Sequence, residues 1–200
     1  MSRTNFVWTD KPCANGRRHK GTCIFARYLT VQVISETRLK TCRAYVCNQP
    51  IINNWHNDAE ERNLRFSSVK RAKEACDRAL LHALQLQVEE LQPKFSGNMA
   101  DLFNPERVLR LKWLRDPEGS YLGQEWQWRL RVTPLPSGMH NVHMVYETTT
   151  DFMSERLPIF SRDLKEAQIL AEDALREHIA AIVSKMQDPA PLEMLKEGAA

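Results

Sequence analysis

The sequence contains one helix-forming pattern twice, and this repeat constrains the fold more than any other feature. Residues 67–80 and 162–175 align at a constant offset. The matching positions are Lys70 with Lys165, Ala72 with Ala167, Cys76 with Ala171, Asp77 with Glu172, Ala79 with Ala174, and Leu80 with Leu175. Small residues recur at steps of three and four in both copies, which predicts a helix with a narrow face that lies close to a sheet. We therefore predict two tandem modules of α+β class, each a three-stranded antiparallel sheet packed by one C-terminal helix.

Chain length and composition agree with two small modules. The 200 residues are 42% hydrophobic, enough for one domain or two small ones, and the repeat favours two. The net charge of +3 is only mildly basic, so the distribution of charge, rather than its total, must indicate the partner.

The N-terminus and the cysteines predict a cytoplasmic location. The first residues lack the apolar core of a signal peptide, and no run approaches the roughly 20 apolar residues that span a bilayer. The five cysteines are an odd number without a secretory context, so reduced thiols are expected. We expect a soluble, cytoplasmic protein without a membrane partner.

Residues 1–25 are predicted to form a short strand and a basic arm. Residues 6–8 are apolar enough for one edge strand, and the segment after them is basic and contains glycines. Cationic loops are more often simply solvated, but this arm could contact phosphates. The candidate contacts in the arm are Arg17, Arg18, His19 and Lys20.

Residues 26–91 are predicted to be the first module. Apolar and polar residues alternate over 26–34 and again over 41–47, which predicts a hairpin of two half-buried strands. A weaker third strand is expected at 51–52 or at 63–66.

The first helix has recognisable start and stop signals. Ser67 or Ser68 can cap it, and it should end near Leu91 because Pro93 stops it. Two prolines and a glycine within residues 92–107 predict a linker between the modules.

Residues 108–186 are predicted to be the second module. Alternation over 109–113, 126–133 and 142–147 predicts three strands separated by turns.

A capping box marks the start of the second helix. Asp163 is followed three residues later by Glu166, as such a box requires, and Ser161 is the alternative cap. The helix should run to about Met186, and residues 187–200 are predicted to be a loosely held tail.

If the apolar face of each sheet covers a helix, the opposite faces are basic, and the acidic residues collect on the helices. The second sheet would carry Arg110, Lys112, Arg129, Arg131 and His143, and the first would carry Arg43 and Tyr45. Such a sheet can lie along a polyanion, with arginines on phosphates or guanine edges and either Tyr28 or Tyr45 stacked on an unpaired base. The alternative is that Arg and Lys simply populate an exposed antiparallel face.

The order of three strands and a helix, with arginines and aromatic residues on the strands and alanines at helical spacing, resembles the AP2-type and phage-integrase arm-binding modules. The resemblance implies DNA recognition by a three-stranded sheet. The turns and glycines that mark the plant AP2 family are not recognisable in this chain, and a double-stranded RNA-binding module has a further helix before its strands. No family is therefore assigned.

Motifs for catalysis are absent from the sequence. There is no His-Glu-x-x-His or Gly-x-Ser-x-Gly motif and no tight cluster of carboxylates, so we expect a protein that is not an enzyme and uses no cofactor. Cys13, Cys23, Cys42 and Cys47 could supply four zinc thiolates, but their spacing is unusual, and buried or idle thiols are the alternative. Cys76 lies in the small-residue stripe and is expected in the core.

The leading hypothesis is a non-catalytic DNA- or RNA-binding protein that uses its basic sheets and its basic arm. The alternative is a protein-interaction module, such as a phage-type inhibitor or an adaptor that docks on a host defence or nucleic-acid-processing complex. Two similar modules without catalytic residues suit either. The sequence leaves the type of nucleic acid and the oligomeric state open.

Overall fold

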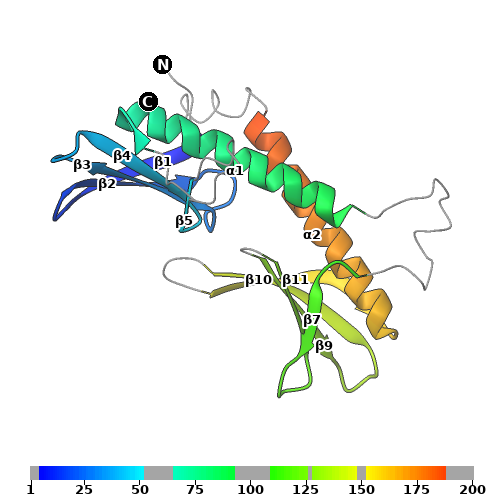
Figure 1. Ribbon diagram of the computed structural model, residues 1–200. Coiled ribbons are helices and arrows are strands. Elements are labelled where there is room, and N and C mark those ends of the chain that lie inside the picture. The colour runs from blue at the N-terminus through cyan, green and yellow to red at the C-terminus, as the bar shows by residue number, and fades with distance from the viewer. Residues whose placement is uncertain (1–4, 52–64, 93–108, 126–127, 148–151, 188–200) are drawn as a thin grey trace, which may run out of the picture. The chain divides into compact units, whose positions relative to one another are not determined.

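The described residues of the chain fold into two antiparallel sheets and two long helices, as seen in a computed structural model (Figure 1). This confirms the α+β class and the presence of two sheet modules, although the sheets have six and five strands where the sequence predicts three. The predicted linker and tail fall almost entirely outside the described residues. The structure describes residues 5–51, 65–92, 109–125, 128–147 and 152–187.

The chain divides into two compact units that are not its two halves. Unit 1 comprises residues 1–84 and 182–200, and unit 2 comprises residues 85–181. Each unit therefore contains one sheet, most of one helix and the last turns of the other helix.

The first sheet, in unit 1, is an antiparallel meander. Its strand order is β1-β2-β3-β4-β5, and β6 also pairs with β4. The strands are β1 (Phe6–Cys13), β2 (Gly16–Cys23), β3 (Thr30–Glu36), β4 (Thr41–Val46), β5 (Gln49–Pro50) and β6 (Arg65–Phe66). The predicted hairpin is confirmed as β3 and β4, and the weaker third strand is represented by the short β6.

The predicted basic arm is a β-hairpin, so the expected loop was wrong. β1 and β2 pair along their whole length, from Phe6 opposite Cys23 to Cys13 opposite Gly16. On β2 the residues His19, Gly21 and Cys23 are buried and alternate with polar ones. Histidine and glycine are weak apolar signals, which is why the strand is hard to see in the sequence.

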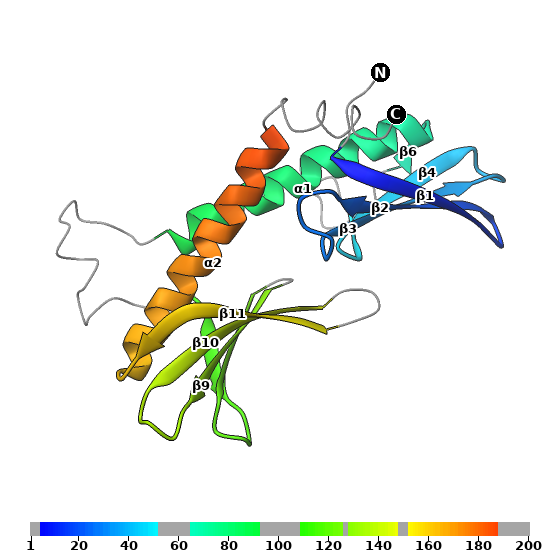
Figure 2. The same cartoon turned by 180° about the vertical axis from the view of Figure 1, so that it is seen from behind.

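Helix α1 (Val69–Leu91) lies along one face of the first sheet (Figures 1 and 2). The helix begins after Ser68, whose Oγ accepts a hydrogen bond from the backbone N–H of Arg71 at 3.3 Å, as expected of a cap. Cys76 is fully buried in the small-residue stripe, as predicted, and its Sγ lies 3.9 Å from the carbonyl oxygen of Tyr45 on β4. The narrow stripe thus lets helix and sheet approach closely.

The second sheet, in unit 2, is also an antiparallel meander, with the order β11-β10-β9-β8-β7. Its strands are β7 (Lys112–Arg115), β8 (Tyr121–Glu125), β9 (Trp128–Pro134), β10 (His140–Glu147) and β11 (Phe152–Ser161). The three predicted strands correspond to β7, β9 and β10, whereas β8 and β11 were missed. Gly123 interrupts the pattern of β8, and Pro158 lies in β11, which is an edge strand where proline is tolerated.

Helix α2 (Leu164–Gln187) lies alongside the second sheet (Figure 2). Asp163 caps the helix as predicted, because the backbone N–H of Glu166 donates to Oδ1 of Asp163 at 2.7 Å. The reciprocal bond of a capping box is replaced by one to Ser161, since the backbone N–H of Asp163 donates to Oγ of Ser161 at 2.9 Å. The Glu166 carboxylate in turn accepts a hydrogen bond from the hydroxyl of Ser161. The cap also carries negative charge at the positive end of the helix dipole.

Replacing Asp163 with alanine is expected to lower the free energy of unfolding by about 1 kcal/mol, because one backbone N–H of the first turn loses its acceptor. The Asp163→Asn variant keeps the acceptor and serves as the control. Chemical denaturation of both variants measures the effect. Equal midpoints for Asp163→Ala and the wild-type protein would show that the cap contributes nothing.

A tryptophan paired with a glycine occurs at the corresponding position of both sheets. Trp8 on β1 lies opposite Gly21 on β2, and Trp113 on β7 lies opposite Gly123 on β8. A Cβ atom at Gly123 would lie 3.0 Å from ring carbons of Trp113, so the ring occupies the space that a side chain would need. This shared pair extends the internal repeat from the helices into the sheets.

The repeated helix acids Asp77 and Glu172 both hold the start of a first strand. The Asp77 carboxylate accepts a hydrogen bond from Nδ2 of Asn5 at 3.1 Å, immediately before β1. The Glu172 carboxylate accepts from the backbone N–H groups of Arg110 and Leu111 at 2.9–3.1 Å, immediately before β7. The repeat therefore preserves a contact as well as a sequence pattern.

Each unit also contains the last turns of the helix that lies mostly in the other unit: α2 ends in unit 1, and α1 ends in unit 2. Both helix ends form hydrogen bonds within these units. In unit 1, Nδ2 of Asn5 also donates to the carbonyl oxygen of Met186 in α2 at 3.2 Å. In unit 2, the indole N–H of Trp128 donates to Oε1 of Gln87 in α1 at 2.6 Å, and both side chains are buried.

Candidate nucleic-acid interface

The outer face of the first sheet, opposite α1, carries a row of cations that crosses the strands. We call this the cationic row. Its members are cross-strand neighbours in register: Lys11 on β1, Arg18 on β2, Ile34 on β3, Arg43 on β4 and Arg65 on β6. Adjacent strands lie roughly 4.8 Å apart, so a row over five strands is about 19 Å long.

A second row of polar side chains runs beside the cationic row. It consists of Thr9, Lys20, Gln32 and Tyr45. Tyr45 is partly exposed on this face, whereas Tyr28 is 9% exposed and belongs to the core. Of the two tyrosines considered for stacking, the structure therefore leaves Tyr45.

The β1–β2 part of the outer face carries positive charge without a neutralising carboxylate. Lys11 lies directly opposite Arg18, and both are exposed. Like charges placed opposite each other destabilise a sheet. Within the described part of the chain, neither these two residues nor Lys20 forms a salt bridge. The positive charge of Lys11 and Arg18 is therefore not balanced by a described salt bridge.

The β4–β6 end of the cationic row contains an acidic residue that holds two arginines. Nε of Arg43 donates to Oε1 of Glu36 at 2.6 Å, and Nη1 of Arg65 lies 3.4 Å from Oε2 of the same carboxylate. The Glu36 side chain is 10% exposed, against 37% for Arg43 and 48% for Arg65. The hydrogen bond to Glu36 raises the pKa of Arg43.

Alternation along β2 separates the predicted arm residues. Arg18 and Lys20 lie on the outer face, but Arg17 and His19 have the opposite parity. His19 is buried, and its Nδ1 lies 2.7 Å from Oδ1 of Asp10, so it is not a surface phosphate contact. This hydrogen bond lowers the pKa of the Asp10 carboxyl group.

Among the residues whose side chains are described, the outer face of the second sheet carries fewer Lys and Arg residues than that of the first. Lys112 and Arg129 are exposed there, and Arg131 lies opposite His143 in the register. Nη2 of Arg131 lies 3.4 Å from Oδ2 of Asp116, which partly neutralises it.

Apolar side chains also share the outer face of the second sheet. Leu114 is 59% exposed and lies opposite Leu122. The described parts of the two outer faces therefore differ in chemistry, since that of the second sheet includes exposed apolar side chains.

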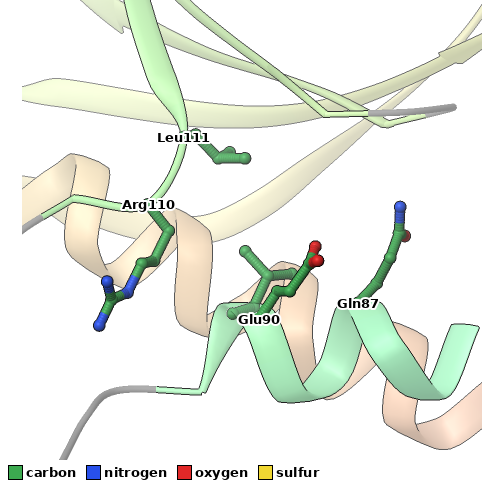
Figure 3. A pocket seen from close by; sticks show the side chains of 5 residues that line it. Gln87, Glu90, Arg110 and Leu111 are labelled. Carbon is green, nitrogen blue, oxygen red and sulfur yellow. The ribbon is translucent and has the colours of Figure 1, made fainter.

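Arg110 does not lie on the outer face of the second sheet, because it precedes β7 and does not belong to a strand. It lines a pocket of about 230 Å³ in unit 2, shown in Figure 3. The other lining residues are Gln87, Glu90 and Leu91 of α1 and Leu111. The backbone N–H of Arg110 donates to Glu172 just before β7 begins, so the alternation of the strand does not apply to this residue.

Sequence reasoning missed three residues of the cationic face. Lys11 was included in the arm without a role, and Arg65 was part of the weak third strand. Glu36 lies beyond the predicted strand over 26–34, but it is the last residue of β3 and its parity places it on the outer face. The alternation of β3 continued by two residues would have identified Glu36.

Four of the five cysteines lie in the core, and Cys13 is partly exposed. Cys23, Cys42, Cys47 and Cys76 are buried, and burial raises the pKa of Cys47 and Cys76 to about 12. No group of three or more His, Cys, Asp or Glu side chains that could hold a metal ion occurs among the described residues.

Neither helix in the described part of the chain combines the length and apolar character needed to cross a bilayer. No protein-family model matches the chain, and no match was found among curated proteins or among solved structures.

Proposed function

We propose that the protein binds nucleic acid without catalysis, through the outer face of its first sheet. The observation that carries the proposal is the cationic row, in which four of five cross-strand neighbours are Lys or Arg. A polyanion lying across the strands would meet these charges in succession. Phosphate contacts of this kind supply most of the sequence-independent affinity for nucleic acid.

The neighbouring row adds groups suited to bases. Tyr45 offers an aromatic surface for stacking, and Gln32 opposite it offers both a donor and an acceptor. Phosphate contacts position a nucleic acid strand, whereas contacts to bases distinguish one sequence from another. In the second sheet, Lys112, Arg129 and Arg131 provide a weaker extension of the same chemistry.

The Arg18→Ala/Lys20→Ala double variant tests the interface. These side chains form no described salt bridge, so the free energy of unfolding should change by less than about 0.5 kcal/mol for each substitution. Binding to a labelled oligonucleotide should weaken. The slope of log affinity against log salt concentration should flatten by about 0.7–0.9 for each phosphate contact removed.

A matched control removes two positive charges from the helix side of the same unit. Lys70 and Arg78 are exposed residues of α1, and Lys70→Ala/Arg78→Ala should leave the salt slope unchanged. Equal weakening by both double variants would show that net charge, not the outer face, determines binding. If the wild-type protein does not bind oligonucleotides at low salt, the proposal is wrong, and a protein partner becomes the function to test.

A further inference from the structure

We propose that Arg43, Arg65 and Glu36 form a clamp for one backbone phosphate, with Glu36 acting as a positioning residue for the two guanidinium groups. This inference rests on the proposed function and adds a defined phosphate site to it. The clamp lies where β3, β4 and β6 meet on the outer face of the first sheet.

The register brings the two arginines together. Arg43 on β4 lies directly opposite Arg65 on β6. Two like charges in this relation repel each other, so an adjacent carboxylate is needed to hold both side chains there. Glu36 meets this need with one oxygen toward each arginine. Thr41 adds a further contact, because Nη1 of Arg65 lies 3.3 Å from its Oγ1.

The cluster has more positive charge and more donors than Glu36 can satisfy. Two guanidinium groups carry ten N–H donors, whereas one carboxylate offers about four acceptor sites. One arginine would be enough to neutralise a single buried carboxylate. The second arginine therefore leaves a formal excess of one positive charge, carried by the partly exposed side chains of Arg43 and Arg65.

A phosphate group can neutralise the excess positive charge and accept hydrogen bonds from the remaining N–H donors. Arginine pairs with phosphate through two parallel hydrogen bonds, and this geometry depends on how the planar guanidinium is oriented. A carboxylate that fixes two such groups therefore prepares them for a tetrahedral oxyanion. Lys11 and Arg18, at the other end of the cationic row, lack such an orienting partner in the described structure.

The Glu36→Gln variant separates positioning from simple charge, because the two effects have opposite signs. Removing a negative charge from a cationic face should strengthen binding to a polyanion if charge alone matters. If Glu36 positions the arginines, binding to a labelled oligonucleotide should weaken by roughly tenfold, which corresponds to about 1.4 kcal/mol. Stronger binding by Glu36→Gln would overturn the clamp.

Arg65 provides a second test, in which the buried carboxylate itself is kept. Its side chain is 48% exposed, so Arg65→Lys should fold normally, which thermal unfolding can verify. Lysine keeps the charge but lacks the planar fork. We expect Arg65→Lys to lose most of the affinity that Arg65→Ala loses. Wild-type affinity for Arg65→Lys would contradict the clamp, even if Glu36→Gln failed to fold.

The outcomes distinguish the clamp from the interface as a whole. The interface would stand without the clamp if Arg18→Ala/Lys20→Ala weakens binding while Glu36→Gln strengthens it and Arg65→Lys keeps wild-type affinity. Absence of oligonucleotide binding by the wild-type protein would reject both.

Discussion

Replacing Glu172 with alanine is expected to lower the free energy of unfolding by about 3–5 kcal/mol, because a buried carboxylate that holds several donors is lost. The Glu172 side chain lies in the core of unit 2, where the residue is only 2% exposed. Its carboxylate accepts hydrogen bonds from the backbone N–H groups of Arg110 and Leu111 and from the indole N–H of Trp113. Each donor left unpaired by the substitution costs about 1–3 kcal/mol when it is buried.

A buried carboxylate is tolerated here because its oxygens are saturated by donors. The contact also decides where β7 begins, since two consecutive backbone N–H groups bind to the same side chain. Loss of Glu172 should therefore loosen the edge strand as well as remove hydrogen bonds. Hydrogen exchange at Leu111 should accelerate in the variant.

Chemical denaturation of three variants checks this prediction. Glu172→Gln keeps the shape and one acceptor oxygen, so it should lose less stability than Glu172→Ala. Glu177 lies on the same helix and is exposed, and Glu177→Ala should stay within about 0.5 kcal/mol of the wild-type protein. If Glu172→Ala unfolds at the same denaturant concentration as Glu177→Ala, the carboxylate does not anchor the strand.

Replacing Trp128 with alanine should have a comparable effect, a loss of about 3–5 kcal/mol, because a large buried side chain leaves a cavity. Trp128 is 1% exposed and contacts the ring of His178, with ring centroids 5.7 Å apart. Its indole N–H donates to Gln87, which lies in the last turns of α1. Thermal or chemical unfolding of the variant measures the loss.

A double-mutant cycle isolates the hydrogen bond from the packing. Trp128→Phe removes the donor, Gln87→Leu removes the acceptor, and each single variant leaves one buried group unpaired. The double variant should therefore be more stable than the sum of the two single losses implies, by about 0.5–3 kcal/mol. Additive losses would mean that the two groups do not interact. Leu86 is 43% exposed, and Leu86→Ala serves as a control in the same turn of α1.

The Trp128–Gln87 contact explains why the compact units differ from the predicted module boundaries. A cut placed in the predicted linker would leave Gln87 with the first half and Trp128 with the second. The indole N–H would then lose a buried acceptor. The same reasoning applies to Asn5 and the carbonyl oxygen of Met186 in unit 1.

Both helices and four of the strands follow from local patterns in the sequence. Regular apolar spacing and local caps specify these elements, as the Asp163 cap shows at the start of α2. The strands β3, β4, β9 and β10 alternate strongly between apolar and polar residues. Signals of this kind lie within a few neighbouring residues, so they can be read without knowledge of the fold.

Contacts between distant segments determine which charged residues hold the fold together and which lie on the outer face of a sheet. Arg65 lies 29 residues from Glu36 in the sequence and becomes its neighbour only because β6 pairs with β4. Glu172 resembles any exposed helix acid until the start of β7 packs against it. β1, β2, β8 and β11 form because adjacent strands satisfy their backbone groups, although their own apolar patterns are weak. Pairing between distant segments supplies this information, since a period along one strand specifies its faces but does not specify its neighbours.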